Sequence, residues 1–325
     1  MFRTLRAALT LIAFLFAAPL LAQQAVRAYP ARPVKIVIPL GPGNSLEIAV
    51  RMVAEKLTVA LGQPFVIEPQ PGAAGQIGAA NVARAAADGY TLLAANDGII
   101  TMLPNLRKKV PYDSLRDFQP ITQLVGIPFV LITHPSVPAA NVGELIALAK
   151  SQPGKLEFSS GGNGSSQQLA MELFMSMTDT RFTHVPYKGA PQAAMDVVSG
   201  QIPVAFAGVP IVAALVKEKK LRALGVAGNQ RLALLPGTPT FDEQGVPFHF
   251  IAWGGLFAPA GTPMQIVNRL NQESIKALRS PDIQERLGAF GLQAYGSSPE
   301  KFAEIIRSDL ARIAEVVKAA GIPQE

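Results

Sequence analysis

Cysteine is absent from this 325-residue sequence. Its absence excludes disulfides, a thiol nucleophile and an N-terminal cysteine that could be lipid-modified. Histidine is scarce as well: His134, His184 and His249 are the only three, and their spacing fits no metal-binding motif. We interpret them as structural, and the sequence predicts neither a metal site nor any other cofactor.

Charged side chains make up only 16% of the sequence, whereas apolar residues make up 49%. A chain of this length and composition can fold into about two domains of roughly 100–200 residues each. The low charge argues against disorder. Lysine and arginine are scattered, and the one dense basic cluster, at residues 217–220, follows a helical pattern and is typical of a helix C-terminus. Nothing in the sequence supports nucleic-acid binding.

The N-terminus differs from the rest of the chain. Arg3 and Arg6 precede an apolar stretch over residues 7–18, which is too short for a membrane span of about 20 residues. This pattern predicts a cleaved signal peptide over about residues 1–25, and hence a mature protein that is free in the periplasm of a Gram-negative cell. Its removal would lower the formal net charge of +6 by two. The alternative cleavage positions are Ala22, Ala25 and Ala28.

Strand and helix patterns alternate in two successive runs. Such an order predicts parallel sheets that are covered by helices on both faces. In the first run we expect strands at residues 34–38, 65–68 and 90–95, a helix at 45–61 and an Ala-rich helix reaching 88–89. In the second run we expect strands at residues 129–132, 156–159, 183–187, 204–206 and 221–226.

These two runs predict an α/β fold of two lobes, like that of a type II periplasmic binding protein. Residues 26–125 and 253–325 would form the first lobe, and residues 126–252 the second. The chain would cross between the lobes near residues 119–125 and 250–256, so that two crossing strands join two mainly parallel sheets. A helix after Pro263 and a last helix from Pro299 would complete the first lobe.

Two glycine-rich loops each connect a strand to a helix. Residues 39–45 read Pro-Leu-Gly-Pro-Gly-Asn-Ser, and residues 159–166 read Ser-Ser-Gly-Gly-Asn-Gly-Ser-Ser. Free N–H groups and partial positive charge at a helix N-terminus bind anions, and ligands of parallel sheets lie at the carboxyl ends of the strands. One such site in each lobe fits a ligand with a carboxylate at each end. Glycine-rich turns also occur at this position in α/β proteins that bind no ligand there.

Enzyme motifs are missing from both loops. Neither ends in the Gly-Lys-Ser/Thr of a nucleotide-binding loop. The chain also lacks a Gly-x-Ser-x-Gly elbow, so Ser165 has no support as a nucleophile. A hydrolase would additionally need a base beside Ser165. The sequence therefore predicts a binding protein and not an enzyme.

The two loops and their flanks resemble the Bug family, the periplasmic receptors of tripartite tricarboxylate transporters. The resemblance spans nearly the whole chain after the predicted signal peptide. No single motif is decisive, but many occur in the family's order. They lie at residues 29–34, 39–51, 61–64, 71–79, 88–93, 111–113, 184–189, 200–201, 221–224, 235–240 and 253–263.

This resemblance implies two hinged lobes that hold a small carboxylate through backbone groups and bridging waters and deliver it to membrane transporter subunits. We expect anion-directed donors at Gly43, Asn44, Gly162, Asn163, Gly164 and Ser165. The pocket walls would come from Leu40, Gly41, Asn96, Thr101, Tyr187 and Ala207, although Tyr187 also fits a core or rim aromatic.

The sequence departs from the family's pattern at several of these positions. Leu40 replaces a phenylalanine of the first loop. Asn44 and Glu47 form a capping-box pattern, so we expect Glu47 to cap the helix and not to contact the ligand. Gln168 stands where many relatives have histidine, and Ala207, expected in a third loop that faces the other lobe, replaces an aspartate of some relatives.

Two of these features bear on the class of ligand. An α-ammonium group in a closed cleft needs a carboxylate partner, because an unpaired buried charge is costly. Ala207 offers none, and Asp97 lies in an Asn-Asp-Gly turn sequence that favours bonding to its own backbone. The expected ligand is therefore a small dicarboxylate or another organic acid without an α-amino group.

The sequence leaves two functions open for such a protein, which we expect to be a monomer. One is a receptor that captures a carboxylate for a tripartite tricarboxylate-type transporter. The other is a ligand-sensing subunit that signals to a membrane sensor kinase. Both would use closure of the lobes on the ligand.

Overall fold

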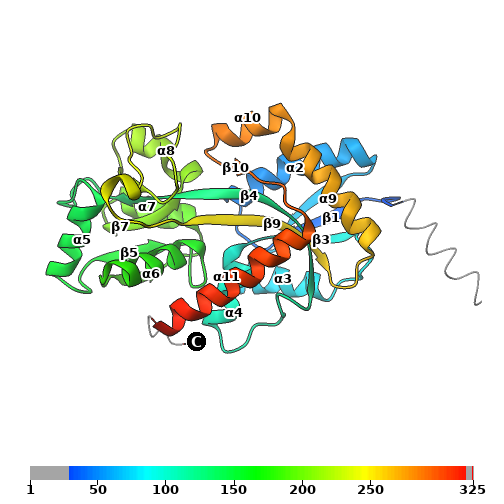
Figure 1. The fold of residues 1–325 in the computed structure, drawn as a ribbon, viewed down its shortest axis with the longest axis horizontal. Coiled ribbons are helices and arrows are strands. Elements are labelled where there is room, and N and C mark those ends of the chain that lie inside the picture. The colour runs from blue at the N-terminus through cyan, green and yellow to red at the C-terminus, as the bar shows by residue number, and fades with distance from the viewer. Residues whose placement is uncertain (1–28, 320–323, 325) are drawn as a thin grey trace, which may run out of the picture.

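The computed structural model describes residues 29–319 and residue 324, so the predicted signal peptide lies outside the described residues. Two groups of strands and helices lie side by side and are joined by two long strands (Figure 1). These strands are β4 (Phe118–Thr133) and β9 (Ile251–Pro259). The prediction of a two-lobed α/β fold is confirmed.

The first lobe is built on three parallel strands. β1 (Val34–Ile38) lies between β2 (Phe65–Pro69) and β3 (Thr91–Asn96), and β9 pairs with β3 in the antiparallel direction. β1 is buried at four of its five positions, as expected for a strand covered on both faces. The helical segments of this lobe are α2 (Ser45–Leu61), η1 (Ala73–Gly75), α3 (Gln76–Ala83), η2 (Gly98–Met102), α4 (Leu103–Leu106), α9 (Met264–Arg279), α10 (Pro281–Ala289) and α11 (Pro299–Ala319).

The second lobe repeats this plan. β5 (Glu157–Ser160) lies between β6 (Thr183–Pro186) and β7 (Val204–Gly208), all parallel. The last part of β4 is antiparallel to both β7 and β8 (Arg222–Val226). Its helices are α5 (Val142–Ser151), α6 (Ser166–Thr178), α7 (Ala190–Val198), α8 (Val209–Lys217) and the short η3 (Asp242–Gln244).

Strand β4 belongs to both sheets. It pairs with β9 from Phe118 to Pro128, and from Phe129 onward it pairs with β7. The chain passes to the second lobe along β4 and returns along β9. Because these two strands are antiparallel to their neighbours, both sheets are mixed and not simply parallel.

Helix α11 packs against elements of both lobes. It contacts β4, η2 and α4, and also α6 of the second lobe, and in Figure 1 it runs diagonally past the two long strands. Phe302 and Ile306 are fully buried in this interface. The ring of Trp253 in β9 packs edge-on against Phe302, with centroids 5.1 Å apart. The last helix therefore braces the crossing strands.

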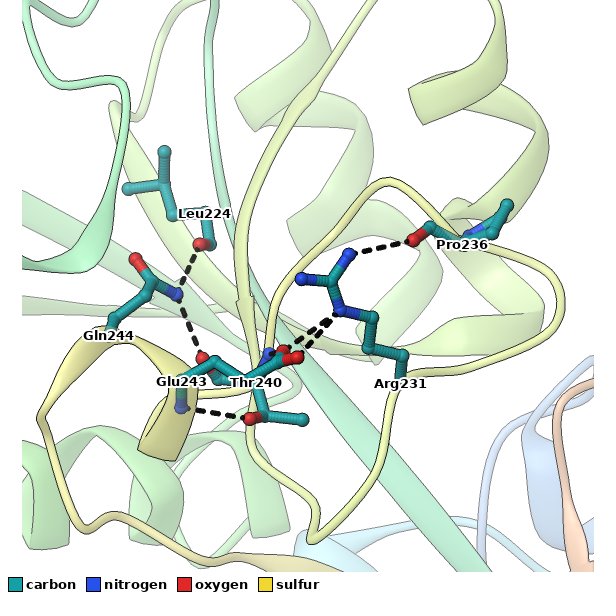
Figure 2. A network of polar contacts seen from close by, with 6 residues as sticks. All are labelled: Leu224, Arg231, Pro236, Thr240, Glu243 and Gln244. Carbon is teal, nitrogen blue, oxygen red and sulfur yellow. Dashed lines mark hydrogen bonds and ion pairs between the residues drawn. The ribbon is translucent and has the colours of Figure 1, made fainter.

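A polar network fixes the loop between β8 and η3 (Figure 2). The backbone N–H of Thr240 donates to the Glu243 carboxylate, and the N–H of Glu243 donates to the Thr240 hydroxyl. Arg231 Nε lies 2.9 Å from both Glu243 carboxylate oxygens. This loop reaches the first lobe, where a Cβ at Gly291 would lie 3.2 Å from Leu234 Cδ1.

Several local expectations need correction. The Ala-rich helix ends at Ala83, well before residue 88. The Asn-Asp-Gly segment is not a turn: β3 runs directly into η2, and Asp97 is its N-cap. Helix α10 and the short strand β10 (Gln293–Ala294) had no counterpart in the sequence analysis. Within the described residues, no helix is long and apolar enough to span a membrane.

Candidate functional site

A pocket of about 60 Å³ lies where the carboxyl ends of the strands of both lobes meet. This volume is large enough for several water molecules, each of which needs roughly 10–15 Å³ on the same measure. The pocket is bounded by the starts of α2, α6, α7 and α8 and by the two crossing strands. It is lined by Leu40, Asn44, Ser45, Leu46, Asn96, Ile127, Phe129, Ser166, Gln167, Ala190, Gly208, Ile211 and Ala252.

The first glycine-rich loop ends in a capping box at the start of α2. The Asn44 side chain accepts a hydrogen bond from Glu47 N at 2.9 Å, and Gly43 N donates to the Glu47 carboxylate at 3.0 Å. Glu47 also pairs with Arg51 one turn later. Glu47 is thus a helix cap, as its spacing from Asn44 predicted.

The second loop has the same geometry at the start of α6. Ser165 is the N-cap, and Gly164 N donates to the Gln168 side chain at 2.9 Å. Deeper in the loop, Gly162 N donates to the Ser160 hydroxyl, which lies 2.6 Å from His184 Nε2. Ser160 is fully buried, so this serine–histidine pair holds the loop and is closed to a substrate.

The N–H groups of Gly43, Gly162 and Gly164 are therefore used within the loops. The first turn of each helix offers further N–H groups to a ligand, since the first residues of an α-helix have no partner within it. Ser45 and Leu46 occupy these positions in α2, and Ser166 and Gln167 occupy them in α6. All four line the pocket.

Apart from the amide side chains of Asn44 and Asn96, the rest of the lining is apolar. Ile127, Phe129 and Ala252 come from the crossing strands, and Ile211 comes from the first turn of α8. Among the described residues that line the pocket, none is charged. An anion here would be held by amide and hydroxyl groups and by helix N-termini.

The two lobes touch directly beside the pocket. Asn96 Nδ2 donates to the Ser166 hydroxyl at 3.3 Å, and this hydroxyl donates to Asp97 Oδ1 at 2.5 Å. A Cβ at Gly98 would meet the carbonyl oxygen of Gly164, and a Cβ at Gly164 would overlap the Leu103 side chain. Such contacts require glycine at both positions and describe a closed arrangement of the lobes.

Asp97 is a buried carboxyl at this contact, only 4% exposed. Burial raises the pKa of Asp97 to about 7, against the opposing effects of hydrogen bonds from Ser166 and from Gly98 N. Asp309 of α11 raises this pKa further, whereas Arg312 lowers it. Asp97 can therefore change its protonation state near neutral pH.

Three of the predicted site residues line the pocket: Leu40, Asn44 and Asn96. The other predicted residues of the two glycine-rich loops are outside its lining: Gly41, Gly43, Gly162, Asn163, Gly164 and Ser165.

The remaining three predicted residues point elsewhere. Thr101 is fully buried in η2, and its hydroxyl donates to the Asp97 carbonyl. The Tyr187 hydroxyl donates to Asp196 on α7. Ala207 lies within strand β7 and not in a loop, and it packs in the core of the second lobe.

The sequence analysis missed Ser45, Ser166 and Gln167 as lining residues. Ser45 and Ser166 directly follow an N-cap residue, and Gln167 is one residue further along α6. That position itself could have identified them, because helix N-termini present their free N–H groups one or two residues beyond the cap.

The family model of the tripartite tricarboxylate transporter family receptor, TctC, matches residues 49–322. The chain belongs to this family. Among TctC relatives, it is 33% identical to the protein BugT of Bordetella pertussis over 95% of each chain. It is also 35% identical to a Pseudomonas protein named for the tcbD-tcbE intergenic region, over 89% of this chain and 86% of that one.

Solved structures of the TctC type have the same fold. A Rhodopseudomonas palustris protein solved with bound malate is 30% identical, with a TM-score of 0.82 over 89% of this chain and all of that one. An R. palustris protein solved with adipate is 32% identical, with a TM-score of 0.85 over 91% of this chain and 99% of that one. The periplasmic binding protein BugD is 30% identical, with a TM-score of 0.83 over 91% of this chain and all of that one. The family and these neighbours are solute-binding proteins and not enzymes.

Proposed function

We propose that this protein captures a small organic acid without an α-amino group in the periplasm and delivers it to a tripartite tricarboxylate-type transporter. The observation that supports this most directly is the pocket itself. It combines amide and hydroxyl groups at two helix starts with an uncharged lining. Binding of adipate and malate by two neighbours agrees with a carboxylate ligand.

The polar part of the pocket suits a carboxylate. Asn44 and Asn96 bring amide groups from the first lobe, and Ser166 and Gln167 bring a hydroxyl and an amide from the second. The N-termini of α2 and α6 add partial positive charge. A carboxylate can thus be bound from both lobes without a lysine or arginine, and its binding would favour their closure.

The same pocket offers no partner for an ammonium group. No carboxylate lines it. Two acidic residues directly follow lining residues, and both have partners: Glu47 accepts from Gly43 N and pairs with Arg51, and Asp97 accepts from Gly98 N and from Ser166. A buried ammonium without a carboxylate partner is costly. Amino acids should therefore bind much more weakly than the corresponding acids.

Matched pairs of ligands test this proposal. Thermal-shift measurements would compare succinate with aspartate and glutarate with glutamate, together with a panel of mono-, di- and tricarboxylates, since a ligand that binds the folded state stabilises it. We expect at least one acid without an amino group to raise the melting temperature, and neither amino acid to do so at millimolar concentration. Larger shifts with aspartate and glutamate would refute the ligand class.

Location and partner are tested in cells. We expect the mature protein in the periplasmic fraction, beginning between Gln23 and Tyr29, and expect deletion of its gene to abolish uptake of the identified acid. Uncleaved protein in the membrane pellet would contradict the predicted export. Normal uptake with a loss of gene induction would favour the sensory function instead.

A further inference from the structure

The Ser166 hydroxyl is shared between the pocket and Asp97. Ser166 lines the pocket and is the first residue of α6 in the second lobe, whereas Asp97 ends β3 in the first. Asn96 Nδ2 donates to Ser166 Oγ at 3.3 Å, and Ser166 Oγ donates to Asp97 Oδ1 at 2.5 Å. Among the described residues, these are the hydrogen bonds found for this hydroxyl.

The protonation state of Asp97 decides what Ser166 can offer to a ligand. A serine hydroxyl has one hydrogen to donate and two lone pairs to accept with. Beside an ionised Asp97, its hydrogen points at the carboxylate and one lone pair is already used by Asn96. Only a lone pair then faces the pocket, and this lone pair repels a ligand carboxylate.

A proton on Asp97 reverses this pattern. The carboxylic acid donates to Ser166 Oγ, Asn96 donates to the second lone pair, and the serine hydrogen is free to turn into the pocket. When a ligand carboxylate accepts this hydrogen, the one hydrogen and both lone pairs of the hydroxyl all have hydrogen-bond partners. The Ser166 hydroxyl can therefore donate to a ligand only while Asp97 is protonated.

We propose that Asp97 makes carboxylate capture proton-linked: a ligand carboxylate is received by the Ser166 hydroxyl when Asp97 carries a proton, so that binding takes up a proton at Asp97. This inference rests on the proposed carboxylate-binding function. Asp97 is a positioning residue in this scheme, because it acts on the ligand through Ser166.

The surroundings of Asp97 support such a role. It is buried at the contact between the lobes, and the charged side chains that act on it are Asp309 and Arg312, both on α11. Those two pair with each other, and Asp309 also accepts a hydrogen bond from Trp253 of β9. Its partner from α6 is the neutral Ser166. Among the residues that the structure describes, no cation forms an ion pair with Asp97, and Arg312 acts on it only at longer range.

The direction of the pH dependence follows from linkage. Burial raises the pKa of Asp97 to about 7 without a ligand, and an adjacent ligand carboxylate would raise it further. Affinity is then fully present below about pH 7 and falls as the pH rises through the pKa of the complex, by at most about tenfold per pH unit. By reciprocity, the ligand makes Asp97 a weaker acid.

Calorimetry with adipate from pH 6 to 9, in buffers of different ionisation enthalpy, tests the proton uptake. We expect the Kd of the unaltered protein to rise above about pH 7, with protons taken up on binding at pH 8. In Asp97→Asn, the amide can donate permanently to Ser166, so Kd should be independent of pH and tighter than that of the unaltered protein at pH 8.5. Ser166→Ala should bind several-fold more weakly at pH 6 and should retain only the smaller pH dependence that direct repulsion between Asp97 and the ligand carboxylate causes.

Asp282→Asn is the matched control, since it removes the same charge from an exposed carboxylate that pairs with Lys56 and is not part of the pocket lining. Its pH profile should be that of the unaltered protein. Two results would overturn the proposal: weaker binding by Asp97→Asn at every pH, or a pH profile of Asp97→Asn that equals that of the unaltered protein. Both are expected if Asp97 has only a structural role.

A second measurement separates this inference from the proposed function. Titration of the ¹³C-labelled aspartate carboxyl carbons in the ligand-free protein, assigned through Asp97→Asn, should show Asp97 changing state near pH 7. If it titrates at the ordinary value of about 4, the proton linkage is refuted even if adipate binds. If Asp97 titrates near pH 7 but no acid binds, the proposed function is refuted, whereas the raised pKa of Asp97 is confirmed.

Discussion

The starts of α2 and α6, one in each lobe, have the same local structure. Residues 43–47 read Gly-Asn-Ser-Leu-Glu, and residues 164–168 read Gly-Ser-Ser-Gln-Gln. Each begins with a left-handed glycine, at φ +76° in Gly43 and +80° in Gly164. In each, this glycine donates to the side chain four residues later. The residue after the glycine caps the helix, and the next serine lines the pocket.

Their surroundings differ. A Cβ at Gly43 would have no neighbour within 4 Å, whereas one at Gly164 would overlap Leu103 of the other lobe. The α2 start uses a carboxylate that is paired with Arg51, and the α6 start uses the neutral Gln168. The two starts present similar donors to a ligand, but of the two glycines only Gly164 packs against the other lobe, and only the first start contains a charge.

The largest expected effect separates the two glycines. Gly43→Ala and Gly164→Ala impose similar backbone strain, about 1 kcal/mol each in the free energy of unfolding. Gly164→Ala additionally pushes Leu103 away and prevents closure. We expect it to weaken carboxylate binding at least tenfold, about 1.4 kcal/mol, and Gly43→Ala to weaken it much less. Calorimetry and urea unfolding measure the two quantities separately.

Equal losses of affinity in the two variants would show that closure does not depend on the contact between Gly164 and Leu103. A larger loss in Gly43→Ala would place the ligand against the first loop and not against the first turn of the helices.

The two caps should differ in stability. Asn44 accepts from Glu47 N at 2.9 Å, whereas Ser165 accepts from Gln168 N at the longer distance of 3.4 Å. Loss of an N-cap costs about 1 kcal/mol. We expect Asn44→Ala to lower the free energy of unfolding by about this amount and Ser165→Ala to lower it by less, as measured by urea denaturation. The opposite order would mean that the geometry of the cap does not set its contribution.

The third comparison introduces at the start of α6 a carboxylate like that of Glu47 at the start of α2. Gln168→Glu preserves the acceptor for Gly164 N but adds a carboxylate beside the pocket with no arginine in the position of Arg51. Repulsion should weaken the binding of a carboxylate ligand by about threefold, and the effect should shrink in high salt. Tighter binding in this variant would indicate a cationic group in the ligand. Calorimetry at two salt concentrations decides between these outcomes.

Much of this arrangement was predictable from the sequence. The alternating apolar patterns placed β1 and α2 at their observed residues, and the spacing of Asn44 and Glu47 predicted their capping box. These features depend on local periodicity and on side chains three residues apart, which a sequence displays directly.

The contacts between the lobes were not predictable in the same way. Asp97 and Ser166 are 69 residues apart and come together only because two helices begin at facing sheet edges. The Asn-Asp-Gly segment favours a turn locally, yet tertiary packing starts a helix there. The first glycine loop contributes Leu40, Asn44 and Ser45 to the pocket lining, and the second contributes Ser166. The N–H groups of Gly43, Gly162 and Gly164 are used within the loops.

The smallest expected effect on ligand affinity concerns the Glu47 carboxylate at the start of α2. Glu47→Gln retains an acceptor for Gly43 N and removes the ion pair with Arg51, whose side chain is 57% exposed. Exposed ion pairs contribute about 0–1 kcal/mol, and the Glu47 side chain of this pair is only 11% exposed. We therefore expect the free energy of unfolding to fall by up to about 1 kcal/mol and affinity to stay within about twofold. Urea unfolding and calorimetry check both values. A loss of binding in Glu47→Gln, with stability unchanged, would mean that Glu47 contacts the ligand, and the two helix starts would then have different functions in spite of their common geometry.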